Sequence, residues 1–365
     1  MSLSAAEQDV ERASRLARSE TVGRGLAAVR AWLYLIATLV FVMVLVGGAT
    51  RLTGSGLSIT EWKPVSGAIP PLTEQAWTAE FDKYRQISQY ELVNKGMTLS
   101  EFKEIFWWEW SHRQLGRAIG LVFGLGFIGF LATGVLRGRL ALTVLALGLL
   151  GGLQGAIGWI MVASGLKPGM TAVAPVKLML HLTTASVILA GLLAVAAGLG
   201  RSAPEPTTRR VRGLATATLV AVLFQIALGA LVAGSKAGLT YNTWPLMDGR
   251  FVPHLSGLFV ISPWFENLVD NPLTVQFNHR MMAYALVAVA VAQAWTARRS
   301  LPGSSAARRT GAIASLALAQ AALGVATLLA ITPLSLGLAH QAFAMLVLSM
   351  AAVHWRLTRS VRPPA

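Results

Sequence analysis

The sequence contains no cysteine and carries little charge. Without cysteine the chain forms no disulfide, zinc–thiolate site or iron–sulfur cluster, and any metal must be held by histidine, carboxylate or methionine. Only 13% of its 365 residues are charged, whereas a soluble domain usually has about 25%. Hydrophobic residues make up 54%. These proportions predict a polytopic membrane protein.

Acidic residues are also scarce, with 16 against 31 basic ones and a net charge of +15. Such a charge is compatible with nucleic-acid binding, but most basic residues flank apolar segments, where they set membrane orientation. We therefore expect no nucleic-acid partner. About 30 residues of mixed charge precede the first apolar segment, which does not resemble a secretory signal.

Eight apolar segments are long enough to cross a bilayer, since a spanning helix needs roughly 20 residues. They show no strand-like alternation, so we expect helices. The fold class is thus an all-α integral membrane protein with eight transmembrane helices. Their approximate ranges are 31–50, 113–136, 140–163, 178–200, 213–233, 279–297, 310–331 and 336–355.

Basic residues predict the orientation of these helices. The two ends of the chain and alternate short loops hold 18 of the 31 basic residues but only 5 of the 16 acids. By the positive-inside rule this side is cytoplasmic, with both termini. The long loops, about 51–111 and 234–278, then face outward.

The two halves of the chain resemble each other. After the first and fifth segments a Gly-Leu pair precedes a tryptophan by five residues, and later segments pair "SHRQLGR" with "NHRMMAY" and "HLTTA" with "HQAFA". A parallel repeat of this kind predicts two pseudo-symmetric four-helix bundles. The expected parts are a cytoplasmic segment 1–30, bundles 31–200 and 213–356, a cytoplasmic linker 201–212 and a tail 357–365.

Four of the six histidines fall near the outer ends of even-numbered segments: His112, His181, His279 and His340. Any one alone is ordinarily a satisfied polar residue, but ionisable residues inside a membrane are costly and often functional. Four at repeated places favour function. His254 and His354 have no repeat partner and are interpreted as surface or interface residues.

Two histidines per half suit axial ligation of haem iron, which needs only two ligands beyond the porphyrin. Zinc usually needs three or four protein ligands. A di-iron carboxylate site needs Glu-x-x-His twice, whereas Glu109 supplies it once and Gln276 breaks the second copy. The residues therefore favour two haem sites.

Arginines and glycines near these histidines have two interpretations each. Arg113, Arg117 and Arg280 are candidates to pair with haem propionates, or they extend to the membrane surface. Small residues in the segments either make room for a macrocycle or allow close helix packing. Glu109 itself is either functional or a residue that favours a helix N-terminus.

Several motifs together make the sequence resemble the heme A synthase family, in the form close to the mitochondrial enzyme. They are "GGATRLTGSGLSITEWKPVSGAIPP", "EWSHRQLGR", "TYNTWPLMDGRFVP", "FNHR" and the histidines that open the fourth and eighth segments. The resemblance spans about 30–356. Some members carry a cysteine pair in the outer loops, which is absent here.

The resemblance implies an oxidoreductase that uses oxygen and a reductant to convert the C8 methyl of heme O into the formyl group of heme A for terminal oxidases. It implies haem b on His279 and His340, the substrate haem on His112 and His181, and an essential acid at Glu109. As partners it implies heme O synthase, oxidase assembly proteins and an unidentified electron donor. We expect a bacterial cytoplasmic (inner) membrane location, with the mitochondrial inner membrane as the less favoured alternative. A face of small residues is compatible with a homo-oligomer or with contact to lipid.

Two other functions are compatible with the residues alone. One is a di-haem membrane cytochrome b that only transfers electrons, and the other is a haem transporter or chaperone. The outer position of all four histidines argues against the first, because electrons would then not cross the membrane. Parallel repeats are common in transporters, so the second stays open.

Overall fold

The computed structural model describes residues 5–199 and 205–359, and within these ranges the chain is helix and loop. Eight helices are long and apolar enough to span a membrane. The chain is therefore an all-α integral membrane protein, as predicted. The eight are α1 (Ala5–Leu52, spanning from Val22), α4 (Leu99–Ala132), α5 (Gly138–Gly165), α6 (Pro175–Gly198), α7 (Arg209–Gly234), α10 (Pro272–Ser300), α11 (Ser305–Leu329) and α12 (Leu334–Leu357).

Three helices begin well before the predicted segments, and the first of them is α1, which begins at Ala5 rather than near 31. Helix α4 begins at Leu99 rather than near 113, because a capping box closes its first turn: the side chains of Thr98 and Glu101 bond each other's backbone N–H groups. Helix α10 begins at Pro272 rather than near 279, with Asn271 as N-cap. Of the predicted linker 201–212, residues 201–204 lie outside the described ranges and the end is already helix α7.

Helices α1, α6, α7 and α12 form the centre of the molecule, where the two halves of the chain meet. Helix α6 packs on α7 and on α12, while α1 packs on α12. Across this contact, Nε2 of Gln341 donates to the carbonyl oxygen of Val44 at 2.6 Å. Buried leucines and isoleucines, including Leu33, Leu189 and Leu348, fill the same region.

Outer helix pairs flank this centre, α4 with α5 on one side and α10 with α11 on the other. Helix α1 packs on α4 and α6, and α7 packs on the corresponding α10 and α12. Helices α5 and α11 likewise pack on α6 and α12. This order of neighbours agrees with two repeated four-helix units, and the pseudo-two-fold relation between them stays a prediction.

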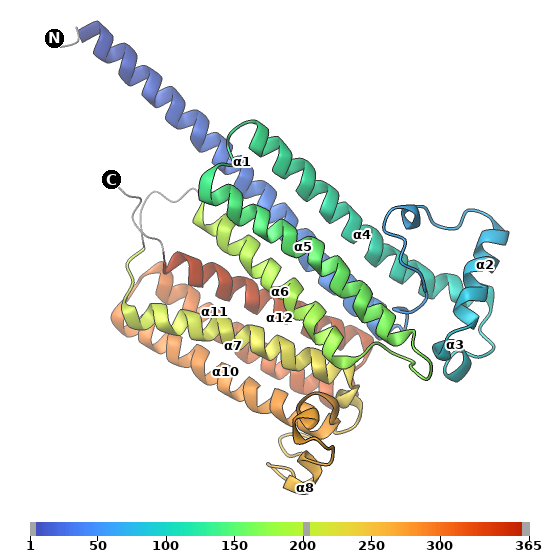
Figure 1. The fold of residues 1–365 in the computed structure, drawn as a ribbon. Coiled ribbons are helices and arrows are strands. Elements are labelled where there is room, and N and C mark those ends of the chain that lie inside the picture. The colour runs from blue at the N-terminus through green and yellow to red at the C-terminus, as the bar shows by residue number, and fades with distance from the viewer. Residues whose placement is uncertain (1–4, 200–204, 360–365) are drawn as a thin grey trace.

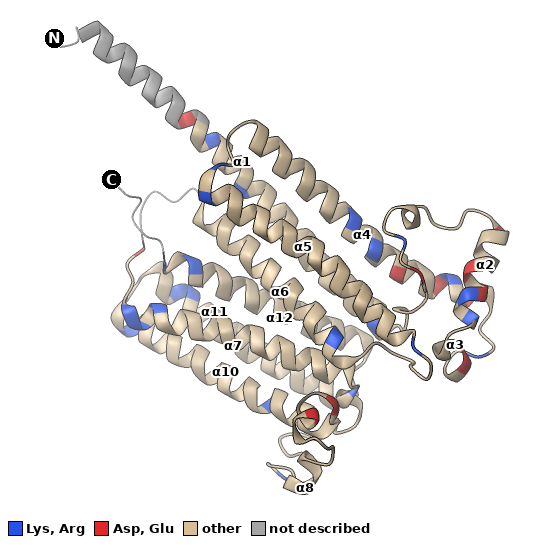
Figure 2. Ribbon diagram, in the orientation of Figure 1, with Lys and Arg blue, Asp and Glu red and all other residues tan. Residues whose placement is uncertain are grey.

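The two long loops gather at one end of the helices, and the described ends of the chain lie at the other (Figure 1). One long loop contains α2 (Glu74–Arg85) and α3 (Ser88–Leu92), and the other contains α8 (Leu255–Leu258) and α9 (Asn267–Asp270). Acidic residues are concentrated at the loop end, where basic residues also lie, whereas the opposite helix ends carry arginine with little acid (Figure 2). This distribution agrees with the outward orientation predicted for the loop end by the positive-inside rule, and the orientation stays a prediction.

The first long loop forms an aromatic cap against the outer part of α4. Trp77, Phe81 and Tyr84 of the loop are buried against Phe102 and Phe106 of α4. Trp77 meets Phe106 edge to face with ring centroids 4.9 Å apart, a favoured aromatic geometry. The cap fixes the loop backbone beside the part of α4 that carries Glu109 and His112.

Candidate functional site

Each of the four predicted histidines abuts a glycine on a neighbouring helix. A methyl group on Gly47, Gly158 or Gly324 would lie 2.8 Å from Cε1 of His112, His181 or His340, and one on Gly229 would lie 3.1 Å from Cε1 of His279. Any side chain at these glycines would displace the ring. The histidines sit on α4, α6, α10 and α12, and the glycines on α1, α5, α7 and α11.

Within each half the two imidazoles are close enough to interact electrostatically, His112 with His181 and His279 with His340. All four side chains are half-buried. The described part of the chain has no cluster of three or more His, Cys, Asp or Glu able to hold a metal ion. The donor set therefore fits a metal that brings its own equatorial ligands, as haem iron does, and does not fit zinc or a di-iron centre.

Three of the histidines also contact a glutamine that sequence reasoning missed. The Nε2 atoms of Gln154, Gln225 and Gln320 lie 3.0, 3.0 and 3.2 Å from Nδ1 of His181, His279 and His340. Each glutamine stands four residues before the glycine that abuts the same histidine. The Gln-x-x-x-Gly spacing, repeated three times, was the available signal, and it also identifies Gly324, which was not predicted.

Glu109 is buried, with 3% of its surface exposed, and both oxygens of its carboxylate accept hydrogen bonds. Its Oε2 accepts from the hydroxyl of Ser58 and the backbone N–H of Ile59, both at 2.9 Å. Its Oε1 accepts from Nη2 and Nε of Arg113 at 2.6 and 3.1 Å. The carboxylate thus joins α4 to the loop that follows α1, one helical turn before His112.

The helix-terminus interpretation of Glu109 is wrong. Glu109 lies ten residues beyond Leu99, the first residue of α4, and a helix dipole acts only within the first turn. The acidic residue at the N-terminus of α4 is instead Glu101, whose carboxylate accepts the backbone N–H of Thr98 in the capping box. The error came from the late predicted start of this helix.

In the second half Gln276 and Arg280 occupy the corresponding place with the opposite hydrogen-bond polarity. Nε2 of Gln276 donates to the carbonyl oxygens of Ala237 and Tyr241 at 2.8 and 3.2 Å. Its Oε1 accepts from Nη2 of Arg280 at 2.8 Å. Both halves therefore dock an outer loop on an i, i+4 pair, and the first half does so with a carboxylate.

The three arginines predicted to pair with propionates differ in whether every guanidinium nitrogen already bonds a protein oxygen. All three guanidinium nitrogens of Arg113 and of Arg117 are bonded to nearby protein oxygens. Arg280 bonds Tyr241 and Gln276, and its buried Nε has no partner among the described residues. A propionate role for any of them stays a prediction, and Arg280 differs from the other two in that its buried Nε has no partner among the described residues.

Glu61 lies in the outer loop and pairs with two lysines. Its Oε2 lies 2.6 Å from Nζ of Lys63 and 2.7 Å from Nζ of Lys83 on α2. Hydrogen bonds from Lys63 and then Lys83 lower the pKa of the Glu61 carboxyl to about 2. Glu61 thus ties the loop to the aromatic cap, as a loop-structuring residue does.

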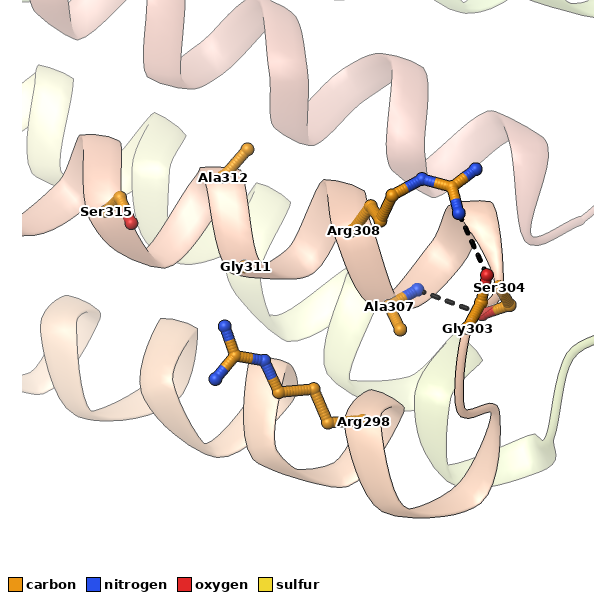
Figure 3. A pocket seen from close by; sticks show the side chains of 8 residues that line it. All are labelled: Arg298, Gly303, Ser304, Ala307, Arg308, Gly311, Ala312 and Ser315. Atoms are coloured by element: carbon orange, nitrogen blue, oxygen red, sulfur yellow. Dashed lines mark hydrogen bonds between the residues drawn. The ribbon is translucent and has the colours of Figure 1, made fainter.

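His354 and a surface pocket between α10 and α11 lie away from these features. His354 is buried at the inner end of α12, with 1% exposed, so it belongs to the helix interface and not to the surface. A pocket of about 430 Å³ lies at the turn between α10 and α11, beside Arg298 and Arg308 (Figure 3). Arg298 is 19 residues from His279 on α10, or about 28 Å at 1.5 Å per residue. The pocket is therefore separate from the histidines.

Comparison with known proteins shows close relatives over nearly the whole chain. Residues 30–352 match the model of a family of cytochrome oxidase assembly proteins. A heme A synthase of Methylobacterium sp. (strain 4-46) is 62% identical over 93% of this chain and 95% of its own length. One of Methylobacterium nodulans is 64% identical over 88% and 89%, and one of Brucella anthropi is 50% identical over 96% and 97%.

The resemblance seen in the motifs is confirmed by these matches. The relatives are bacterial and the chain has eight candidate spans, so it is a multi-pass membrane protein of a bacterial type. The family match, residues 30–352, spans nearly all of both predicted four-helix bundles. The chain belongs to the heme A synthase family of cytochrome oxidase assembly proteins.

Proposed function

We propose that the chain is a heme A synthase that oxidises the C8 methyl group of heme O to a formyl group. Each of two successive hydroxylations replaces a C–H bond by C–O–H and consumes oxygen and reductant. The resulting geminal diol loses water to leave the formyl group. The names of its relatives support this reaction, and the observation that carries it is the buried carboxylate of Glu109 one turn from His112.

In this proposal His279 and His340 hold a resident haem b in the second half. Two imidazoles facing glycines, with no larger metal-binding cluster in the described ranges, suit a bis-histidine haem. When bound, haem b supplies one-electron transfer. The protein contributes the orientation of both imidazole rings and, at Arg280, a buried N–H that remains available for a propionate.

The first half, with His112 and His181, receives heme O. The burial of the outer helices supports this division. In the apolar stretch of α4 no residue is buried inside the molecule, whereas 33% of the residues are buried in the apolar stretch of α10. The buried share is 6% for α5 and 22% for α11. A loosely enclosed half suits exchange of an apolar substrate with the bilayer, and a tightly packed half suits a permanent cofactor.

Glu109 acts beside the substrate, on the side of His112. Its carboxylate is held in one position by Arg113, Ser58 and Ile59. A fixed, buried carboxylate stabilises positive charge that develops on a reacting carbon, and its oxygens can take up or return a proton. Gln276 cannot titrate, which suits a half that only binds a cofactor.

Purified protein in detergent, reduced and supplied with heme O, tests the proposal and its two rivals. With oxygen, extraction followed by mass spectrometry should yield a formyl haem, whereas anaerobic samples should return heme O. An electron-transfer cytochrome or a haem carrier would return heme O under both conditions. Absence of heme A in the aerobic sample would reject the enzyme assignment.

Membrane placement completes the proposal. We infer that both termini are cytoplasmic and that the protein lies in the cytoplasmic membrane of a bacterium; the basic helix ends in Figure 2 support this by the positive-inside rule. Heme O synthase and oxidase assembly proteins are the natural partners for supply and delivery. Labelling of single cysteines, introduced near residue 95 and near residue 303 of this cysteine-free chain, should succeed from opposite sides of the membrane.

A further inference from the structure

The three glutamines and the glycines that abut the same histidines form one arrangement that occurs three times. Nε2 of Gln154, Gln225 and Gln320 donates to the backbone carbonyl of the neighbouring histidine at 2.8, 3.1 and 2.9 Å and lies beside its Nδ1. The glycine one turn later abuts Cε1 of the same ring. Residues four apart share one helix face, so the amide and the glycine fix the imidazole from one neighbouring helix.

His112 has the glycine of this arrangement but not the glutamine. Gly47 abuts its ring as in the other three sites, but the residue four positions earlier is Met43. Nδ1 of His112 is buried and has no hydrogen-bond partner among the described residues. In the repeat, Met43 occupies the place of Gln225, because both precede the glycine by four residues on α1 and α7.

A histidine that ligates a metal through one nitrogen usually donates the N–H of the other to an oxygen, which fixes the ring and raises its basicity. The side-chain oxygens of Gln154, Gln225 and Gln320 are buried and bond nothing within the described part of the chain. An amide carries donor and acceptor on one rotatable group, so each glutamine can turn its Oε1 to Nδ1–H of a metal-ligating ring, in exchange for its present bond from Nε2 to the histidine carbonyl. A methionine thioether is only a weak acceptor.

We propose that Gln154, Gln225 and Gln320 are positioning residues for three haem-ligating histidines, and that His112, for which Met43 stands in the place of the glutamine, is the ligand that releases. This inference rests on the proposed function. In the second half both histidines are then positioned by a glutamine, which suits a permanent cofactor. In the first half a glutamine positions only His181, and the other ligand, on the helix that carries Glu109, is exchangeable.

The same helix pair therefore carries both differences between the halves. Glu109 replaces Gln276 on α4, and Met43 replaces Gln225 on the adjacent α1. A released His112 leaves the substrate face open on the side of the carboxylate, where the methyl group must react. His181 keeps the haem attached during this release.

The test exchanges glutamine and methionine, which have similar volumes. Gln225→Met and Gln320→Met in the haem b-loaded full chain should raise the midpoint potential of haem b, because an imidazole without its acceptor stabilises ferric iron less. They should also weaken haem b retention about 10- to 100-fold, measured by transfer to apomyoglobin. Gln293→Met is the matched control, since Gln293 is buried on α10 and its side-chain oxygen bonds Thr218 instead of lying beside a histidine.

The reverse change, Met43→Gln, tests the releasing ligand directly. Bound heme O should show a larger low-spin, six-coordinate fraction by electron paramagnetic resonance and transfer to apomyoglobin about 10-fold more slowly. These readouts report ligation and not turnover, so they stay informative even if heme O is never oxidised. Unchanged ligation in Met43→Gln, or equal potential shifts in the Gln293→Met control, would overturn the inference.

Discussion

Glu109 and Arg113 lie one turn apart on α4, and two N–H groups of Arg113 converge on one oxygen of the Glu109 carboxylate, at 2.6 and 3.1 Å. The guanidinium also donates to the carbonyl oxygens of Ile59 and Glu61. The pair therefore ties the loop after α1 to the helix of His112. A residue proposed for chemistry is at the same time part of the loop attachment, and both roles must be separated by experiment.

Replacing Glu109 by glutamine removes the titratable carboxylate while keeping an acceptor for Arg113, although the N–H of Ile59 loses its acceptor. Turnover of heme O should fall by about 10²- to 10⁴-fold, and haem b that is still bound would show that the fold is retained. Product extraction gives the turnover, and the absorption spectrum gives the haem b content. Glu104→Gln, at an exposed position on the same helix, is the control; normal heme A yield from Glu109→Gln would refute the role.

The opposite change in the second half, Gln276→Glu, should destabilise the protein without adding activity. Its carboxylate would face the carbonyl oxygens of Ala237 and Tyr241, to which Gln276 now donates. Loss of these buried bonds should cost about 2–4 kcal/mol, measurable as a lower thermal midpoint in detergent. An unchanged midpoint would show that hydrogen-bond polarity at this position does not matter.

The glycines beside the histidines give a graded prediction. An alanine methyl would lie 2.8 Å from His340 at Gly324 but 3.1 Å from His279 at Gly229. Overpacking of this kind costs about 1–3 kcal/mol, so both alanine variants should retain less haem b, Gly324→Ala the less of the two. Gly120→Ala, whose methyl would meet none of the described residues within 4 Å, should retain all of it. Equal haem content in all three variants would argue against ring positioning by these glycines.

A pH-dependent contribution is expected from the outer loop. Because the pKa of Glu61 is lowered from 4.5 to about 2, its ion pairs stabilise the folded loop above pH 4.5 and lose that effect as pH falls toward 2. The side chain is 43% exposed, so the contribution at pH 7 should stay below about 1 kcal/mol. Hydrogen exchange of residues 57–64 should be faster in Glu61→Gln than in wild type at pH 7. A difference that persists at pH 2 would contradict the assignment.

The spans were predictable because hydropathy alone sets them, and the histidine pairs because they repeat. The start of α4 was not, since its first two turns are amphipathic and contact the aromatic cap instead of lipid. The capping box of Thr98 and Glu101 was readable and would have corrected it. The partners of Glu109 could not be predicted, because Ser58 and Ile59 lie about 50 residues away in the sequence and meet it only through tertiary folding.

The division of labour between the halves is the central claim, and haem retention tests it most directly. His112→Ala and His279→Ala would be purified from cells that make haem b but no heme O, and haem b per chain would be measured by the pyridine haemochrome spectrum. We expect about the wild-type haem b content in His112→Ala and strong loss in His279→Ala. Equal loss from the two variants would contradict the claim.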